Sequence, residues 1–81
     1  MKAAFSNRFI RQYSALSAER KAKFERQLGF LLANLRHPSL RAKKYDEALD
    51  IWQARLDDDY RFYFQVEGDT YRILSIIPHP K

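Results

Sequence analysis

Apolar residues recur at a helical period near the start of the chain. Phe9, Tyr13 and Leu16 follow one another at spacings of four and three, which places them on one face of a helix. Ser6 stands just before them, and a serine hydroxyl is a good N-cap because it accepts a hydrogen bond from a free backbone amide. The pattern predicts a short helix over about residues 6–16.

A second, longer helix is expected to start after Ser17, which is another suitable N-cap. It is predicted to run to about Leu35 and to end before His37-Pro38, because the residue before a proline is pushed out of the helical region. One apolar stripe lies along it: Phe24, Leu28, Leu31, Leu32 and Leu35. So short a connection makes the two helices a helical hairpin.

The period changes to two from Leu49 onward, which predicts strands. Three strands are separated by short turns at residues 57–59 and 68–69, so they form an antiparallel meander, and residues 2–5 are a candidate edge strand. The alternation assigns these side chains to the buried face: Trp52, Ala54, Leu56, Tyr60, Phe62, Phe64, Val66, Tyr71, Ile73 and Ile77. The predicted fold class is α+β, with an N-terminal helical hairpin packed on one face of a small antiparallel sheet.

A three-residue loop at 57–59 fixes the register of the strands on either side. The large apolar residues then share one face, in the pairs Leu56–Tyr60, Ala54–Phe62 and Trp52–Phe64. The same register places Arg55 opposite Arg61 on the other, polar face. Like charges so placed repel, but two guanidinium groups side by side make a good phosphate site. The alternative is that the acidic loop or Glu67 simply neutralises them.

The charge is divided unevenly between the two halves of the chain. The formal net charge is +5, with +9 on residues 1–45 and −4 on residues 46–81. A basic half favours an anionic partner, either nucleic acid or an acidic protein segment. Within it, Arg41, Lys43 and Lys44 cluster in a segment expected to be a loop, where they either follow a phosphate backbone or form an ordinary solvated surface.

Composition excludes several other classes of protein. The 81 residues suit a single domain, and the absence of cysteine excludes disulfides and thiolate metal sites. No apolar run reaches the roughly 18 residues of a membrane span, and no signal peptide is evident, so a cytoplasmic location is expected. His79 near the C-terminus is a candidate acid or base because imidazole titrates near neutral pH.

The order of helix, helix, basic segment and three strands resembles the RelE/ParE superfamily of bacterial toxin–antitoxin toxins. Short segments in matching order carry the resemblance: His37-Pro38, Ala42–Tyr45, Trp52–Leu56, Tyr60–Phe64 and Ile73–His79. Toxins of the RelE type cleave messenger RNA on the ribosome, through attack of the RNA 2′-OH on the adjacent phosphate. The resemblance therefore implies an endoribonuclease without a metal or other cofactor. It also implies an acidic antitoxin as the partner in a hetero-oligomer.

The resemblance also assigns roles to residues. Arg61 matches the arginine that stabilises the transition state, Arg55 a basic residue on the neighbouring strand, and His79 the general acid. Lys43 and Lys44 match lysines that hold RNA, and we add Arg41 from the same segment and Tyr63 from the polar sheet face as RNA-binding candidates: the full set is Arg41, Lys43, Lys44 and Tyr63.

The sequence departs from the family pattern in two places. It ends at Lys81 without the C-terminal tyrosine of many relatives, so that Glu47 or Asp50 becomes a candidate base. An acidic triplet at residues 57–59 stands beside the arginines and would weaken RNA binding. These departures motivate one alternative, a non-toxic relative that only binds an antitoxin. A ParE-like inhibitor of DNA gyrase is a second alternative that stays open.

Overall fold

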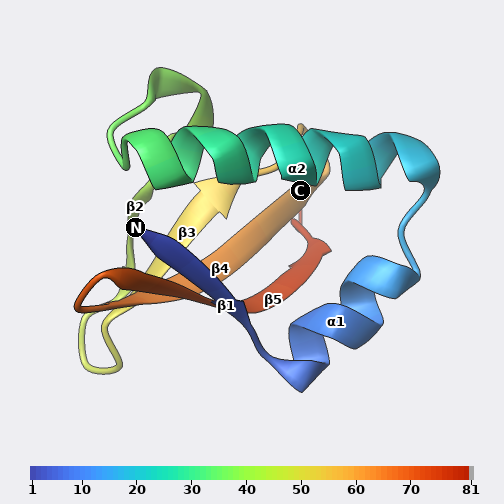
Figure 1. Ribbon diagram of the computed structural model, residues 1–81. Helices are drawn as coiled ribbons and strands as arrows, with labels where there is room; N and C mark the ends of the chain where they lie inside the picture. Colours follow the sequence, from blue (N-terminus) through green and yellow to red (C-terminus); the bar gives the residue numbers. More distant parts are fainter. Residues whose placement is uncertain (81) are drawn as a thin grey trace.

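The computed structural model describes residues 1–80 and confirms the α+β class (Figure 1). Two helices pack on one sheet, and a single 3-10 turn lies between the second helix and the strand at one edge of the sheet. In chain order the elements are β1 (Lys2–Phe5), α1 (Asn7–Ser14), α2 (Ala18–Ala33), η1 (Pro38–Leu40), β2 (Lys43–Asp46), β3 (Ile51–Arg55), β4 (Tyr60–Glu67) and β5 (Thr70–Pro78). Neither helix of residues 1–80 has the length and apolar character needed to cross a bilayer.

The sheet has five strands in the order β1-β5-β4-β3-β2, two more than the predicted meander. The candidate edge strand at residues 2–5 is confirmed as β1, which pairs in parallel with β5. The other addition corrects the sequence-based expectation: part of the basic segment expected to be a loop is strand β2, antiparallel to β3. Four residues with three polar side chains give too little apolar alternation to signal an edge strand.

Serine caps start both helices as predicted. The Ser6 hydroxyl accepts a hydrogen bond from the Phe9 amide at 3.0 Å, and the Ser17 hydroxyl accepts one from the Arg20 amide at 3.2 Å. The second helix ends at Ala33, slightly earlier than predicted, because Asn34 adopts an extended backbone. His37-Pro38 therefore begins η1 instead of ending α2, and the His37 ring stacks on Phe30 at 3.8 Å between centroids.

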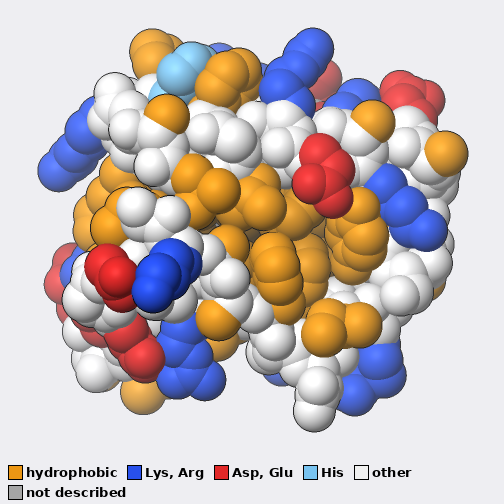
Figure 2. Space-filling model, viewed as in Figure 1, with side chains coloured by type: hydrophobic (Ala, Val, Ile, Leu, Met, Phe, Trp, Pro, Cys, Tyr) orange, Lys and Arg blue, Asp and Glu red, His pale blue; other side chains and the backbone are white. Residues whose placement is uncertain are grey.

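The hydrophobic core lies between the helices and one face of the sheet. Its largest fully buried side chains are Phe24, Phe62, Phe64, Leu31, Leu40, Ile73 and Ile76. Phe24 of α2 lies 5.0 Å from Phe9 of α1 and 5.3 Å from Phe62 of β4, measured between ring centroids, so it joins both helices to the sheet. On the helix side, Figure 2 shows apolar side chains gathered in the middle of the surface with charged side chains around them.

The predicted register of β3 and β4 is confirmed, including the pairing of Arg55 with Arg61. The expected alternation of β5 is wrong beyond Leu74, where a β-bulge separates the pairs Phe64–Ile73 and Tyr63–Ser75. The extra residue reverses the facing, so Ile76 is buried where Ile77 was expected. The Ser6 hydroxyl donates a hydrogen bond to the Leu74 carbonyl at 2.7 Å, which ties the bulge to the start of α1.

Candidate functional site

Five of the seven predicted site residues meet in one hollow on the sheet face that the helices leave uncovered. It encloses about 240 Å³ and is lined by Arg41, Lys43, Gln53, Arg55, Arg61 and His79. These side chains come from five separate parts of the chain: the residue after η1, the edge strand β2, the strands β3 and β4, and the segment after β5. Four permanent cations and an imidazole in one hollow make a site for an anion.

Two neighbouring arginines line this basic hollow, and each guanidinium has its own acceptor. Nη1 of Arg61 donates to the carbonyl oxygens of Asp57 at 2.6 Å and Tyr60 at 3.0 Å. Nη2 of Arg55 pairs with the carboxylate of Asp58. These contacts offset the repulsion between Arg55 and Arg61 and hold the two groups side by side. Nε of Arg55 is buried and has no hydrogen-bond partner within residues 1–80.

The acidic triplet turns mostly away from the hollow. Asp57 pairs with Arg20 of α2 at 3.2 Å and with Lys23 at 3.4 Å, and Asp59 pairs with Arg20 at 3.4 Å. Asp58 instead forms the ion pair with Arg55. The loop thus places one carboxylate against the hollow and commits two to the helix that covers the opposite face.

Asp57 also caps the turn. Its carboxylate accepts hydrogen bonds from the amides of Asp59 and Tyr60, each at 2.9 Å. Burial acts to raise the pKa of Asp57, but these two amides and the Arg20 guanidinium outweigh it and hold the pKa below its ordinary value. Asp57 therefore stays charged and keeps the loop that carries Asp58 in place.

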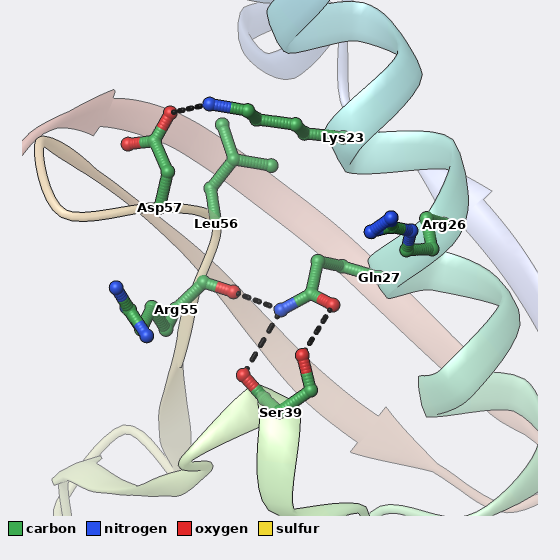
Figure 3. Close-up of a pocket in the computed structure, with 7 residues that line it drawn as sticks. All are labelled: Lys23, Arg26, Gln27, Ser39, Arg55, Leu56 and Asp57. Carbon is green, nitrogen blue, oxygen red and sulfur yellow. Dashed lines mark hydrogen bonds and ion pairs between the residues drawn. The ribbon is translucent and has the colours of Figure 1, made fainter.

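A buried amide fixes the backbone of Arg55 from the helix side (Figure 3). Nε2 of Gln27 donates to the carbonyl oxygens of Arg55 at 2.7 Å and Ser39 at 3.1 Å, and Oε1 accepts from the Ser39 hydroxyl at 3.0 Å. These groups lie at the base of a second hollow of about 210 Å³, into which Lys23 and Arg26 also project from α2. Gln27 is absent from the predicted apolar stripe, because a glutamine in a helix gives no sign of burial.

His79 is held at the rim of the basic hollow through its backbone. Its amide donates to the Asp59 carbonyl at 2.7 Å, which extends the pairing of β4 and β5 past the end of the strand. The imidazole lines the hollow beside Arg61. Its Nδ1 atom is buried and makes no hydrogen bond within residues 1–80.

Two predicted site residues lie outside the basic hollow. Lys44 points to the other face of β2, where it pairs with Asp50 and sits over the Trp52 ring at 4.9 Å. The hydrogen bond to Asp50 raises the pKa of Lys44. The reason for the different placement is the alternation of strand β2, which puts Lys43 and Lys44 on opposite faces once the segment is not a loop.

Tyr63 lies on the expected face but is buried, with 9% of its surface exposed. Its hydroxyl accepts a hydrogen bond from Nε2 of Gln53 at 3.0 Å, and its ring meets Tyr45 edge-on at 4.9 Å between centroids. Gln53 and Tyr45 lie in segments that carry the family resemblance, but neither was predicted as a site residue. Of the two candidate bases, Asp50 pairs with Lys44. No cluster of three metal-binding side chains occurs within residues 1–80.

The architecture is similar to that of several solved toxins. The chain superposes on the YoeB/ParE toxin from Agrobacterium tumefaciens with a TM-score of 0.83 and 14% identity, covering 99% of this chain and 100% of that one. For the RelE–RelB complex from Pyrococcus horikoshii, the TM-score is 0.80 and the identity 18%, and the match covers 95% of this chain and 92% of that one. For the YoeB–YefM complex from Staphylococcus aureus, the TM-score is 0.80 and the identity 17%, and the match covers 99% of this chain and 98% of that one. The chain has the RelE-like fold. At the level of sequence, no family model and no curated protein matches it.

The RelE-like fold confirms the architecture implied by the sequence resemblance. In this chain it covers one face of the sheet with α1 and α2 and leaves the other face, with the basic hollow, open to a ligand.

Proposed function

We propose that the protein is the toxin of a toxin–antitoxin pair and that it cleaves messenger RNA on the ribosome. The convergence of Arg41, Lys43, Arg55, Arg61 and His79 in one hollow carries this proposal. These residues were selected from a register argument, a charge cluster and a family resemblance, and the fold brings them together. The likeness in fold to RelE and YoeB toxins supports the same conclusion.

The chemistry that suits this hollow is transesterification of an RNA phosphodiester. The 2′-hydroxyl gives its proton to solvent as its oxygen attacks the adjacent phosphorus, the bond from phosphorus to the 5′-oxygen breaks, and the products are a 2′,3′-cyclic phosphate and a free 5′-hydroxyl. Arg61 and Arg55 stabilise the negative charge that builds up on the phosphoryl oxygens. Arg41 and Lys43 hold the neighbouring backbone phosphates.

His79 is the proposed general acid, which protonates the departing 5′-oxygen. Because its Nδ1 is buried, Nε2 is the nitrogen we expect to meet the substrate. Lys44 and Tyr63 take a structural part in this scheme, Lys44 at the sheet edge and Tyr63 beneath Tyr45.

The proposed protein partner is an acidic antitoxin. The solved RelE and YoeB structures named above include complexes with RelB and YefM. For this chain, the +9 charge of residues 1–45 favours an acidic segment as the regulator of the hollow. The expected complex is a hetero-oligomer in which that segment and RNA compete for the same cations.

The test is pulse labelling of protein and DNA synthesis after induced expression. The wild-type protein should stop protein synthesis first, and purified protein should cut messenger RNA on programmed ribosomes. Arg61→Ala should lower the cleavage rate by about 100-fold or more, since it removes a donor to the developing charge. Arg72→Ala is the matched control: this exposed arginine pairs with Glu67 and lies outside the hollow.

Two outcomes would overturn the proposal. Full toxicity of soluble, folded Arg61→Ala and His79→Ala variants would show that the hollow is not catalytic. A fall in DNA synthesis before protein synthesis would assign the chain to gyrase inhibition instead. Folding of each variant is checked by its thermal unfolding.

A further inference from the structure

Another hollow lies on the open sheet face and differs in character from the basic hollow. It encloses about 230 Å³ and is lined by Arg8, Tyr45, Ile51, Tyr63, Leu74, Ser75 and Ile77. One cation stands among aliphatic and aromatic side chains. We call it the aromatic hollow, and no step of the proposed cleavage uses it.

An exposed aromatic ring forms one wall of the aromatic hollow. Tyr45 exposes 62% of its surface, although large aromatic side chains usually gain by burial. Its ring is nevertheless fixed, because it packs edge-on against Tyr63 at 4.9 Å between centroids. Tyr63 is held in turn by the hydrogen bond from Gln53 at 3.0 Å. The wall is thus a ring that is pre-positioned and still open on one side.

The aromatic and basic hollows are neighbours on the same three strands. On each strand, one residue of the basic hollow stands two positions from a residue of the aromatic hollow: Lys43 and Tyr45 on β2, Gln53 and Ile51 on β3, Arg61 and Tyr63 on β4. Residues two apart on a strand share a face and are separated by about 7 Å. A site for phosphate and a site for a flat apolar group therefore adjoin at the scale of a nucleotide.

We propose that the aromatic hollow binds a nucleobase of the RNA, stacked on Tyr45, next to the phosphate held in the basic hollow. This inference rests on the proposed function and names the part of the RNA substrate that binds in the aromatic hollow. Stacking on an aromatic ring tolerates any base, because every base has a π face. Arg8 at the rim can pair with a flanking phosphate or lie over the base.

The experiment measures binding of short labelled RNAs by fluorescence anisotropy. Each tetranucleotide carries a 2′-deoxy group at the cleavage position, so that it binds without being cut. A matched series replaces one base at a time by an abasic site. The proteins are the wild type, Tyr45→Ala, Tyr45→Phe and Leu49→Ala, the last because Leu49 is a comparably exposed apolar side chain, at 60%, outside the hollow.

We expect Tyr45→Ala to weaken binding of the intact RNA by about tenfold, within the range known for loss of one stacked base. Tyr45→Phe and Leu49→Ala should stay within twofold of the wild type, because the ring and not the hydroxyl does the stacking. Removing one particular base should weaken the wild type by a similar factor and abolish the difference between the wild type and Tyr45→Ala.

Three results would overturn the inference. One is an unchanged affinity of Tyr45→Ala, which would leave the hollow to a side chain of a protein partner. Another is a loss of wild-type binding affinity that is the same whichever base of the RNA is removed. The third is no measurable binding of any of the RNAs by the wild type. Failure of the proposed function is distinguishable, because it is read from the toxicity of Arg61→Ala and not from Tyr45.

Discussion

The two faces of the sheet use alternate residues of the same strands for opposite purposes. On the helix side, Phe62 and Phe64 of β4 are fully buried and pack on Phe24 and Tyr71. On the open side, Arg61 lines the basic hollow from the position next to Phe62. One strand thus carries a core residue and a candidate catalytic residue side by side, separated only by the pleat.

This comparison shows how an 81-residue chain can have both a core and a charged site. A small domain buries a limited fraction of its surface, so cations placed in its core would cost more than it can spare. The alternation of β3 and β4 keeps the repulsion between Arg55 and Arg61 at the open surface. Stability and proposed function should therefore be separable by single substitutions on adjacent residues.

The largest effect is expected on the buried face. Phe62→Ala should lower the free energy of unfolding by about 3–5 kcal/mol, since it removes a fully buried ring in contact with Phe24. Arg61→Gln, at the adjacent residue, should change it by less than about 1 kcal/mol. Urea unfolding followed by circular dichroism measures both. Equal losses would show that the faces are not energetically distinct.

A smaller loss of unfolding free energy is expected at Gln27, which joins the helix side to the backbone of Arg55 in the sheet. Gln27→Ala should cost about 2 kcal/mol, because it removes the buried amide that donates to the carbonyl groups of Arg55 and Ser39. Its exposed neighbour offers the control: Arg26→Ala should stay within about 0.5 kcal/mol. The same urea titration decides, and comparable losses in the two variants would contradict the role assigned to the buried amide.

Sequence reasoning went furthest where a periodic pattern and a short loop acted together. The alternation around residues 57–59 was enough to fix the pairing of Arg55 with Arg61, because a slip by one residue would expose the core. The serine caps were likewise predictable from local chemistry alone. The arginine pair of the basic hollow followed from that register, and only the structure adds Arg41, Lys43 and His79 to the same place.

The sequence could not show features that depend on contacts between distant segments. The bulge at Leu74 is held by Ser6, which is far away in the chain, and it reverses the facing of Ile76 and Ile77. The burial of Gln27 depends on carbonyl groups of β3 and η1. The facing of Lys44 could not be predicted for a simpler reason: an edge strand of four residues carries too little pattern to be told from a loop.

Acid should weaken the contact that turns the acidic loop toward α2. The pKa of Asp57 is lower in the folded state than in the unfolded chain, so its contribution is present above about pH 4 and is lost as pH falls through the folded-state pKa. Asp57→Asn should cost about 1–1.5 kcal/mol at neutral pH. Urea unfolding at several pH values between 3 and 7 is the measurement, and the difference from the wild type should shrink toward the acid end. A difference independent of pH would contradict this assignment.

The smallest effect on stability, and the most direct test of the open face, concerns Asp58. Its carboxylate pairs with Arg55 and is 84% exposed, so Asp58→Asn should change the free energy of unfolding by less than about 0.5 kcal/mol. The same substitution frees a cation in the basic hollow and should strengthen RNA binding several-fold. The slope of the logarithm of the binding constant against that of the salt concentration should steepen by up to about 0.7, the value for one more phosphate contact on a single strand.

The matched control is Asp69→Asn, which removes the same charge from the turn between β4 and β5, where Asp69 pairs with Lys2. If both variants strengthen RNA binding equally, the effect belongs to the net charge of the protein. If only Asp58→Asn does so, RNA and the acidic loop compete for Arg55, and the chain carries a weak competitor for its own site. An antitoxin segment that places a carboxylate on Arg55 would then use a contact that the loop already makes.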